Sequence, residues 1–284
     1  MLSRIRVYGS FVRVSHTVFA LPFALSGALM AARSVPITWG RVGWIVLAMV
    51  TARTAAMGFN RIVDAEYDAE NPRTASRELP RNVMSMWEAV WIVVIASAIF
   101  VAVAWVLGPL CFALSPVALC IVFWYSLAKR FTTYAQLFLG LALGVAPVGG
   151  WLAAGGGWGW PPILLAVGTS MWVAGFDILY ACEDVDFDRS RGLNSIPAKF
   201  GIAKSLLVSR VFHVIAVMSL AAIALVLSVG LLYLVGVTAV GFLLTYEQSM
   251  VKSDDLSRVK QAFDLNGWVG IVYLITTAVS LYGN

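Results

Sequence analysis

Long apolar runs, repeated along almost the whole chain, constrain the fold more than any other feature of this sequence. A window of about 20 apolar residues lets a helix cross the hydrocarbon core of a bilayer, which is about 30 Å thick. We expect nine transmembrane helices, at residues 16–32, 42–60, 87–107, 110–128, 135–154, 161–181, 205–227, 230–250 and 267–282. The sequence therefore predicts an all-α integral membrane protein.

The composition agrees with a membrane protein. Hydrophobic residues make up 60% of the 284 residues and charged residues only 12%, whereas a soluble domain carries about 25% charged residues. The three cysteines (Cys111, Cys120 and Cys182) form no CxxC pair, so we expect small buried thiols and neither a disulfide nor a metal site. The two histidines, His16 and His213, are far apart in sequence, which disfavours a His-based zinc or haem site.

The positions of the basic residues predict the orientation. Of the 20 Lys and Arg residues, 16 lie in the N-terminal segment 1–15 or in loops that the nine spans place on the same side. Only Arg33 and Arg41 lie on the other side. By the positive-inside rule the N-terminus is cytoplasmic and the C-terminus is outside. The net charge of +5 therefore reflects membrane topology, and no nucleic-acid partner is expected. The basic stretch before the first span also fits a signal peptide, but eight further spans favour a retained anchor.

Acidic residues gather in two places on the predicted cytoplasmic side. In the first, Asn60, Asp64 and Asp68 follow one another at i, i+4 and i+8, which places them on one face if the second helix continues past its apolar part. In the second, Asp184 and Asp188 repeat the i, i+4 spacing. Asp177 and Tyr180 lie one to two turns earlier on a similar face.

Like charges at i, i+4 repel each other in a helix, so both clusters require a compensating cation. Carboxylate and amide oxygens suit Mg²⁺, a hard ion that binds through a few carboxylates and substrate phosphates. The alternative is that these are solvated loops whose acids serve solubility. Two such spacings at cytoplasmic helix ends favour the metal site.

Basic residues accompany the acids, as binding of a diphosphate would require. They are Arg73 and Arg77 after the first cluster, and Lys129 and Arg130, preceded by Tyr125, at the end of the fourth span. Lys129 and Arg130 alternatively serve as positive-inside anchors.

Arg53 lies within the second span, about two turns before Asn60. A charged residue inside the membrane is costly unless it is paired and usually marks a functional site. Arg53 therefore either binds an anionic substrate or pairs with a carboxylate of the protein such as Asp177.

At these residues the sequence resembles the intramembrane aromatic prenyltransferases, the family of 4-hydroxybenzoate polyprenyltransferase. The NxxxDxxxD motif of that family reads Asn60, Asp64 and Asp68, and its continuation reads Asn71, Arg73, Thr74, Arg77, Leu79 and Pro80. The second motif reads Tyr180, Asp184 and Asp188 within FDILYACEDVDFD, followed by GLNSIPAKFG. A further element reads Tyr125, Lys129 and Arg130, with Gln136 beyond it. Arg61 departs from the Asn-Asp pair that opens the first motif in many members.

The resemblance implies one domain over residues 1–284, with nine helices around a central cavity beneath cytoplasmic cap loops. The two motifs lie four spans apart, which is consistent with duplicated four-helix units at about 16–128 and 135–250, plus the ninth helix at 267–282. It also implies a multi-pass enzyme of the bacterial inner membrane whose active site opens to the cytoplasm. That enzyme would prenylate an aromatic acid in ubiquinone or menaquinone biosynthesis, with 4-hydroxybenzoate or a dihydroxynaphthoate as the acceptor.

The resemblance further implies a role for each candidate residue. Two Mg²⁺ ions held by Asn60, Asp64, Asp68, Asp184 and Asp188 would bind the diphosphate of a polyprenyl donor. The rest of its charge would be neutralised by Lys129, Arg130, Arg73 and Arg77, with Tyr125 beside them. Arg53, with Tyr180, would bind the aromatic acid, and Asp177 or Asp184 would act as the base.

Two other classes compete with this interpretation. A secondary transporter of an anionic solute also uses buried Arg and Asp residues, but near the bilayer midplane, whereas most acids here lie at helix ends. A CDP-alcohol phosphotransferase is also membrane-embedded and metal-dependent, but it gathers its aspartates in one continuous motif that this chain lacks.

Overall fold

The computed structural model describes residues 2–12 and 17–283, and in these residues it contains helices and no strand. The long helices are α2 (Thr17–Ala31), α3 (Trp39–Val63), α5 (Met86–Leu107), α6 (Pro109–Phe131), α7 (Ala135–Ala153), α8 (Trp160–Ala181), α11 (Ile202–Leu227), α12 (Leu231–Met250) and α13 (Val259–Tyr282). The short helices are α1 (Leu2–Phe11), α4 (Ala65–Glu70), α9 (Val185–Ser190) and α10 (Ile196–Phe200). The predicted all-α class is confirmed.

Eight of the described helices are long and apolar enough to cross a membrane, and they correspond to the second to ninth expected spans. The first expected span, 16–32, begins at a residue outside the described part of the chain. It is present as α2, which has only 15 residues and contains Pro22. A 15-residue helix is about 22 Å long, shorter than the hydrocarbon core of about 30 Å. Nine crossings, and with them the orientation, therefore stay predictions.

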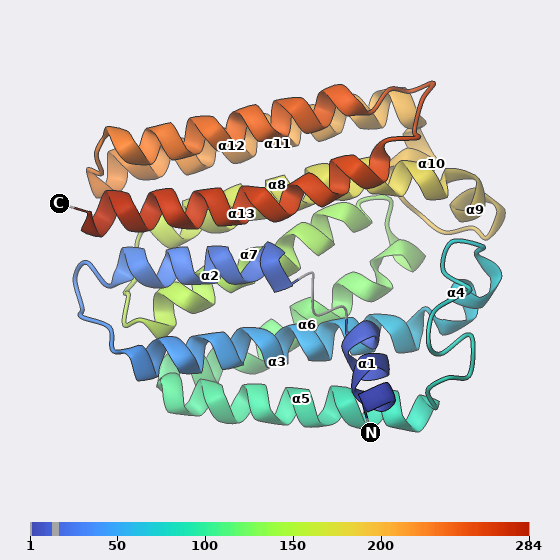
Figure 1. The fold of residues 1–284 in the computed structure, drawn as a ribbon, viewed down its shortest axis with the longest axis horizontal. Coiled ribbons are helices and arrows are strands. Elements are labelled where there is room, and N and C mark those ends of the chain that lie inside the picture. Colours follow the sequence, from blue (N-terminus) through green and yellow to red (C-terminus); the bar gives the residue numbers. More distant parts are fainter. Residues whose placement is uncertain (1, 13–16, 284) are drawn as a thin grey trace.

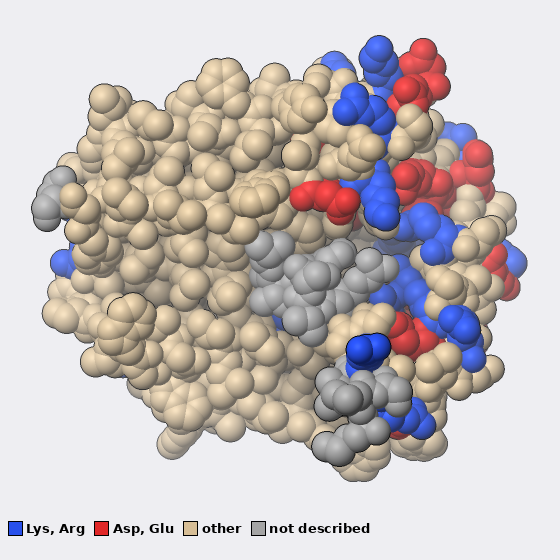
Figure 2. Space-filling model, viewed as in Figure 1, with Lys and Arg blue, Asp and Glu red and all other residues tan. Residues whose placement is uncertain are grey.

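The long helices lie side by side along one axis of the molecule (Figure 1). The connections that carry α4, α9 and α10 lie together at one end, near α1, and the C-terminus lies at the opposite end. Figure 2 shows Lys, Arg, Asp and Glu gathered at the end that carries α4 and α9, while the rest of this face is almost free of charge. We call this end the charged end.

Helix boundaries follow local sequence signals. α5 begins with a capping box, in which Ser85 and Glu88 each bond the backbone N–H of the other. It ends before Gly108, whose φ of 139° suits only glycine, and Pro109 then starts α6. Helices can thus reverse with a single connecting residue at the end opposite the charged end.

The two arginines at this opposite end cap helices. The Arg41 guanidinium donates to the carbonyl oxygens of Leu107 (2.8 Å) and Ala153, which are the last residues of α5 and α7. Arg33 donates to the carbonyl oxygen of Leu227 at the end of α11 (2.6 Å). The last carbonyls of a helix lack intrahelical partners and attract cations. This explains why these two arginines lie on the side that the positive-inside rule leaves poor in basic residues.

Helices from the two expected four-helix units interlock. α2 packs mainly against α7 and α13, and α8 packs against α7 and α11. A buried polar chain ties α8 to α12 and α13, since Trp172 donates to Asn266 (2.7 Å) and Asn266 donates to Glu247 (2.8 Å). This well-packed side leaves room for a cavity on its other side, between α3, α6, α7 and α8. The duplication of units stays a prediction.

Candidate active site

A single cavity of about 650 Å³ collects every candidate residue that the sequence suggests. Its lining includes side chains from α2, α3, α5, α6, α7, α8 and α13 and from the segments after α3 and α8. The candidates that line it are Arg53, Asn60, Asp64, Asp68, Arg73, Arg77, Tyr125, Lys129, Arg130, Asp177, Tyr180, Asp184 and Asp188. The two acidic clusters, more than a hundred residues apart in sequence, thus face one space.

The first cluster lies where α3 passes into α4. The helix continues to Val63 and turns at Asp64, and α4 starts at the next residue. The i→i−4 hydrogen bonds nevertheless persist, because Asp64 N donates to Asn60 O (3.0 Å) and Asp68 N donates to Asp64 O (2.8 Å). The Asn60 amide also donates to the Asp64 carboxylate (2.8 Å). The spacing therefore does keep these side chains close together.

The second cluster follows α8. A short 3₁₀ turn, Cys182–Asp184, leads from α8 into α9. Asp184 and Asp188 are both buried, with 8% and 2% of their surface exposed. The Ser195 hydroxyl donates to Asp188 (2.9 Å) and accepts from the backbone N–H of Ala198, so the same oxygen holds the carboxylate and caps α10.

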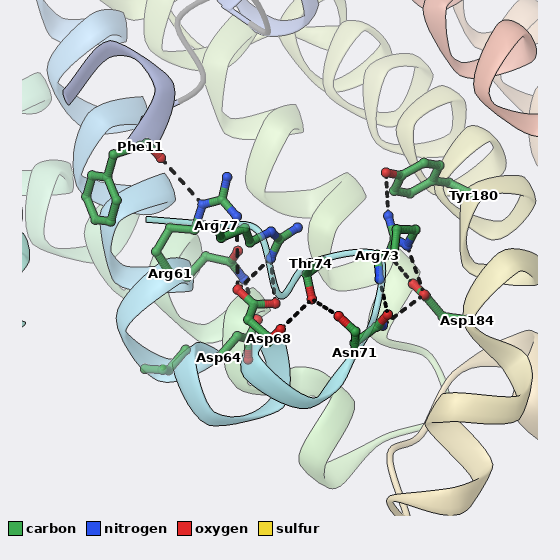
Figure 3. Close-up of polar contacts among 12 residues, drawn as sticks. Phe11, Arg61, Asp64, Asp68, Asn71, Arg73, Thr74, Arg77, Tyr180 and Asp184 are labelled. Carbon is green, nitrogen blue, oxygen red and sulfur yellow. Dashed lines mark hydrogen bonds and ion pairs between the residues drawn. The ribbon is translucent and has the colours of Figure 1, made fainter. Parts of the chain in front are cut away.

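The two clusters are joined by Arg73. Its guanidinium donates to both carboxylate oxygens of Asp184 and lies 4.7 Å from the centre of the Tyr180 ring, a cation–π contact (Figure 3). The Asn71 amide reaches the same carboxylate (3.3 Å). The loop after α4 is therefore fastened to the end of α8.

Every aspartate of the two motifs has a basic partner. Arg77 donates to both oxygens of Asp68 (2.6 Å each), and Arg130 donates to Asp64 (3.3 Å). Lys129 Nζ lies 3.7 Å from Asp188, and Arg73 holds Asp184. The compensation that the like-charge spacing demands thus comes from arginine and lysine side chains.

In the described residues, no group of three or more Asp, Glu, His or Cys side chains converges as a metal site. The donors of the two motifs are nevertheless carboxylate and amide oxygens only, they face one cavity, and each aspartate is paired with a basic side chain. Their chemistry fits a hard divalent ion once the basic partners are withdrawn.

Burial changes the acidity of the site. Burial, and next to it the charge of Asp68, raises the pKa of Asp64 to about 6, although Arg130 and Lys129 oppose the shift. For Arg73, burial is the largest influence and would lower the pKa, but the charges of Asp184, Tyr180 and Glu183 together with the hydrogen bond to Asp184 outweigh it, and the pKa is raised. Arg73 therefore stays a cation, whereas Asp64 titrates close to neutral pH.

Arg53 and Arg61 reach from α3 towards the end of α1. Arg53 donates to the carbonyl oxygen of Val12 (3.1 Å), and Arg61 donates to that of Phe11 (3.4 Å). Arg61 is only 3% exposed, lines the cavity and lies 4.0 Å from Asp68. Arg61 thus places a second guanidinium near Asp68. It occupies the position at which this chain departs from the Asn-Asp pair of the first motif.

Arg61 and Ser195 are two residues of the site for which the sequence predicted no role. Arg61 lies seven residues before Asp68, hence on the same helical face. Ser195 precedes Ile196-Pro197, which is a helix-start pattern. Both patterns are visible in the sequence, but the bonding partners of these two residues depend on how distant segments pack against each other.

Three comparisons with known proteins agree with one another. The sequence profile of the UbiA prenyltransferase family matches residues 20–270. The 4-hydroxybenzoate octaprenyltransferases of Vibrio campbellii and Vibrio parahaemolyticus are each 28% identical to this chain over 98% of its length and 94% of theirs.

Solved structures give the same grouping. An apo UbiA homolog from Aeropyrum pernix K1 is 36% identical, with a TM-score of 0.86 over 93% of this chain and 98% of the other. A UbiA homolog from Archaeoglobus fulgidus bound to DMAPP and Mg²⁺ is 18% identical, with a TM-score of 0.70 over 96% and 99%, and supports the fold.

We expect Arg73→Ala to loosen the loop that follows α4. Losing charge-assisted hydrogen bonds to a buried carboxylate costs about 1.5–3 kcal/mol, so backbone amides near Asn71 and Thr74 should exchange about tenfold faster or more. Hydrogen exchange measured by mass spectrometry tests this. Arg81→Ala, at an exposed position of the same loop, is the control. Equal exchange in both variants would contradict the fastening role of Arg73.

We also expect Asp64 to titrate at about pH 6 in metal-free protein. Its folded-state pKa is raised, so the carboxyl is protonated below that pH and its ionisation destabilises the fold as the pH rises through it. Infrared difference spectra against Asp64→Asn, recorded with EDTA, should show a carboxylic-acid band that disappears with that midpoint. A band already absent at pH 5 would show that burial does not control this group.

Proposed function

The chain belongs to the UbiA prenyltransferase family and is therefore a prenyltransferase, and we propose that it transfers a polyprenyl group from a polyprenyl diphosphate to the ring of an aromatic acid. The acceptor we propose is of the 4-hydroxybenzoate or dihydroxynaphthoate type, as in quinone biosynthesis, in the inner membrane with the site opening to the cytoplasm. The observation that carries the proposal is one cavity that is strongly charged at one end and apolar elsewhere. Membership of a prenyltransferase family argues against the two competing classes, a secondary transporter and a CDP-alcohol phosphotransferase.

The diphosphate of the donor would bind at the charged end. Lys129, Arg130, Arg73 and Arg77 all line the cavity there, and each is now bonded to an aspartate. A diphosphate offers these cations a more highly charged partner, and phosphate oxygens suit the planar donors of arginine. The four cations would therefore turn from the aspartates to the substrate.

The aspartates released by this exchange would hold divalent ions. Asn60, Asp64, Asp68, Asp184 and Asp188 would hold Mg²⁺, in two ions by our proposal, and the metal supplies Lewis-acid stabilisation of the leaving diphosphate. The Archaeoglobus fulgidus homologs bound to Mg²⁺ with DMAPP or GPP, and to Cd²⁺, support this use of a divalent ion. Metal and diphosphate binding would then depend on each other, because each frees the ligands of the other.

The chemistry would proceed through an allylic cation. The C–O bond to the diphosphate breaks with its electron pair on oxygen, and the basic side chains stabilise that charge. The apolar walls exclude water, which would otherwise capture the cation. A ring carbon next to the phenolic hydroxyl then forms the new C–C bond and loses its proton.

Acceptor binding would fall to Arg53 together with Tyr180, both of which line the cavity. Arg53 lies within α3, below the charged end, and its planar guanidinium suits a carboxylate. Asp184 would hold Mg²⁺ in this proposal, so we propose Asp177, which also lines the cavity, as the base that takes the proton.

The experiment that tests the function uses membranes with Mg²⁺, geranyl diphosphate and a panel of hydroxybenzoates and dihydroxynaphthoates. Mass spectrometry of the lipid extract should find one prenylated acceptor, identified by its mass and by its dependence on Mg²⁺. Asp64→Asn and Asp188→Asn should each lower product formation by about a hundredfold or more, in line with the loss of electrostatic stabilisation of a leaving group. Unchanged turnover in either variant, with normal expression, would sink the proposal.

Arg53→Ala should raise the KM for the aromatic acid by about tenfold or more, since a bidentate charged pair contributes about 1.5–3 kcal/mol. The KM for the donor should change little. Arg210→Ala, which removes a basic residue from the exposed face of α11, is the control and should alter neither constant. Equal increases in both KM values in Arg53→Ala would rule out a carboxylate clamp.

A further inference from the structure

The cavity that contains the aspartates continues almost to the opposite end of the molecule. Its lining includes Ile45 of α3, Leu107 of α5, Cys111 of α6 and Ala153 of α7. Leu107 and Ala153 are the residues whose carbonyl oxygens Arg41 bonds. The deep end of the cavity is therefore closed where Arg41 ties the ends of α5 and α7 together.

The depth of the cavity follows from helix geometry. The α6 segment from Cys111 to Lys129, both of which line the cavity, is about 27 Å long at 1.5 Å per residue. An extended isoprene unit adds four carbon–carbon bonds of about 1.5 Å and advances the chain by about 5 Å. The space between the basic residues and the deep end thus takes about five units in an extended chain.

The wall of the deep half suits a hydrocarbon chain. It is formed by side chains such as Val117 and Ala118 of α6 and Leu143 and Ala146 of α7. Ser115 also lines it, but its hydroxyl donates to the carbonyl oxygen of Phe112 (2.8 Å) and has no need of water. Because this space is continuous with the charged end, its occupant is the tail of the same molecule whose diphosphate binds there.

Gly149 lies on this path. It is exposed and lines the cavity, and a Cβ atom added to it would meet nothing within 4 Å. Its neighbours Gly144 and Gly150 differ, because a Cβ there would collide with Ser170 of α8 or Ala24 of α2. Those two glycines allow helices to approach each other, whereas Gly149 faces open space.

We propose that the isoprenoid tail of the donor runs along α7 past Gly149 to the deep end, and that Gly149 determines the tail length the enzyme accepts. This inference rests on the proposed prenyl transfer. The α7 segment from Ala135 to Gly149 is about 21 Å long, so a tail reaches Gly149 with about its fourth unit. A larger side chain at this position closes the path to longer tails and leaves shorter ones untouched.

The test compares Gly149→Leu and Gly149→Phe with wild type, using geranyl diphosphate (two units) and pentaprenyl diphosphate (five units) as donors. Overpacking of a tight apolar path should lower kcat/KM for pentaprenyl diphosphate by about tenfold or more in Gly149→Phe, with a smaller loss in Gly149→Leu. The value for geranyl diphosphate should stay within about twofold of wild type, because its tail spans only about 10 Å. This ratio between donors does not depend on how much protein folds.

Gly43→Leu is the matched control. Gly43 lies within α3, a Cβ there also meets nothing within 4 Å, and in the described part of the chain it lies outside the cavity lining. This variant should keep the donor preference of wild type. A loss of pentaprenyl transfer in Gly43→Leu equal to that in Gly149→Phe would overturn the inference.

Cys111, which lines the deep end of the cavity, allows a second measurement, one that reports binding of the tail and not turnover. In a Cys120→Ala background, which removes an exposed thiol, pentaprenyl diphosphate should protect Cys111 from a membrane-permeant maleimide, and geranyl diphosphate should not. Gly149→Phe should abolish the protection, and Cys111→Ser identifies the label.

The outcomes separate the two proposals. Equal donor preference in Gly149→Phe and wild type, or no protection of Cys111 by pentaprenyl diphosphate, would show that the tail leaves the cavity before Gly149. Protection of Cys111 in a wild-type enzyme that transfers neither donor to any acceptor would contradict the proposed function, while supporting the path of the tail.

Discussion

The structure depends on the need to compensate carboxylates that are buried at one end of a membrane protein. An uncompensated buried charge costs several kcal/mol, and Asp68, Asp184 and Asp188 are almost fully buried. Arginine and lysine side chains meet this need, and three of the pairs join segments far apart in sequence: Arg73 with Asp184, Lys129 with Asp188, and Arg130 with Asp64. Arg73 belongs to the loop after α4 but holds Asp184 after α8. Charge compensation therefore also determines how the two motif-bearing segments lie against each other.

In the function we propose, the same pairing would make the site responsive to substrate. A carboxylate that is bonded to arginine is a poor metal ligand, and an arginine that is bonded to a carboxylate is a poor phosphate ligand. If a diphosphate and divalent ions bind together, both sets of groups would gain stronger partners. Arg61 and Arg77 both approach Asp68, so this carboxylate would keep one guanidinium when the other turns away. Beyond Arg53, the remainder of the cavity, down to the Arg41 cap, is lined within the described residues without Lys, Arg, Asp or Glu and would supply an apolar path.

Local patterns predicted well what depends on neighbouring residues. The spacing of Asn60, Asp64 and Asp68 predicted that their side chains lie close together. It could do so because hydrogen bonds from each residue to the fourth before it persist through the turn at Asp64. The span windows succeeded for eight helices. The first window, 16–32, is present as α2 (Thr17–Ala31), which is too short to be identified as a crossing by its length. The bonds from Arg73 to Asp184 and from Ser195 to Asp188 could not be predicted. They depend on the positions that the loops take once the helices have packed, and local sequence patterns do not determine those positions.

The most direct test of this account is the affinity of the site for a divalent ion with and without a diphosphate. Mn²⁺ can report on the Mg²⁺ site by electron paramagnetic resonance, and geranyl thiodiphosphate is a slowly reacting donor analogue. If the basic side chains hold the aspartates until a diphosphate draws them away, Mn²⁺ should bind at least about tenfold more tightly with the analogue, a coupling of about 1.4 kcal/mol. Equal Mn²⁺ affinity with and without the analogue would contradict the exchange of partners on which the mechanism rests.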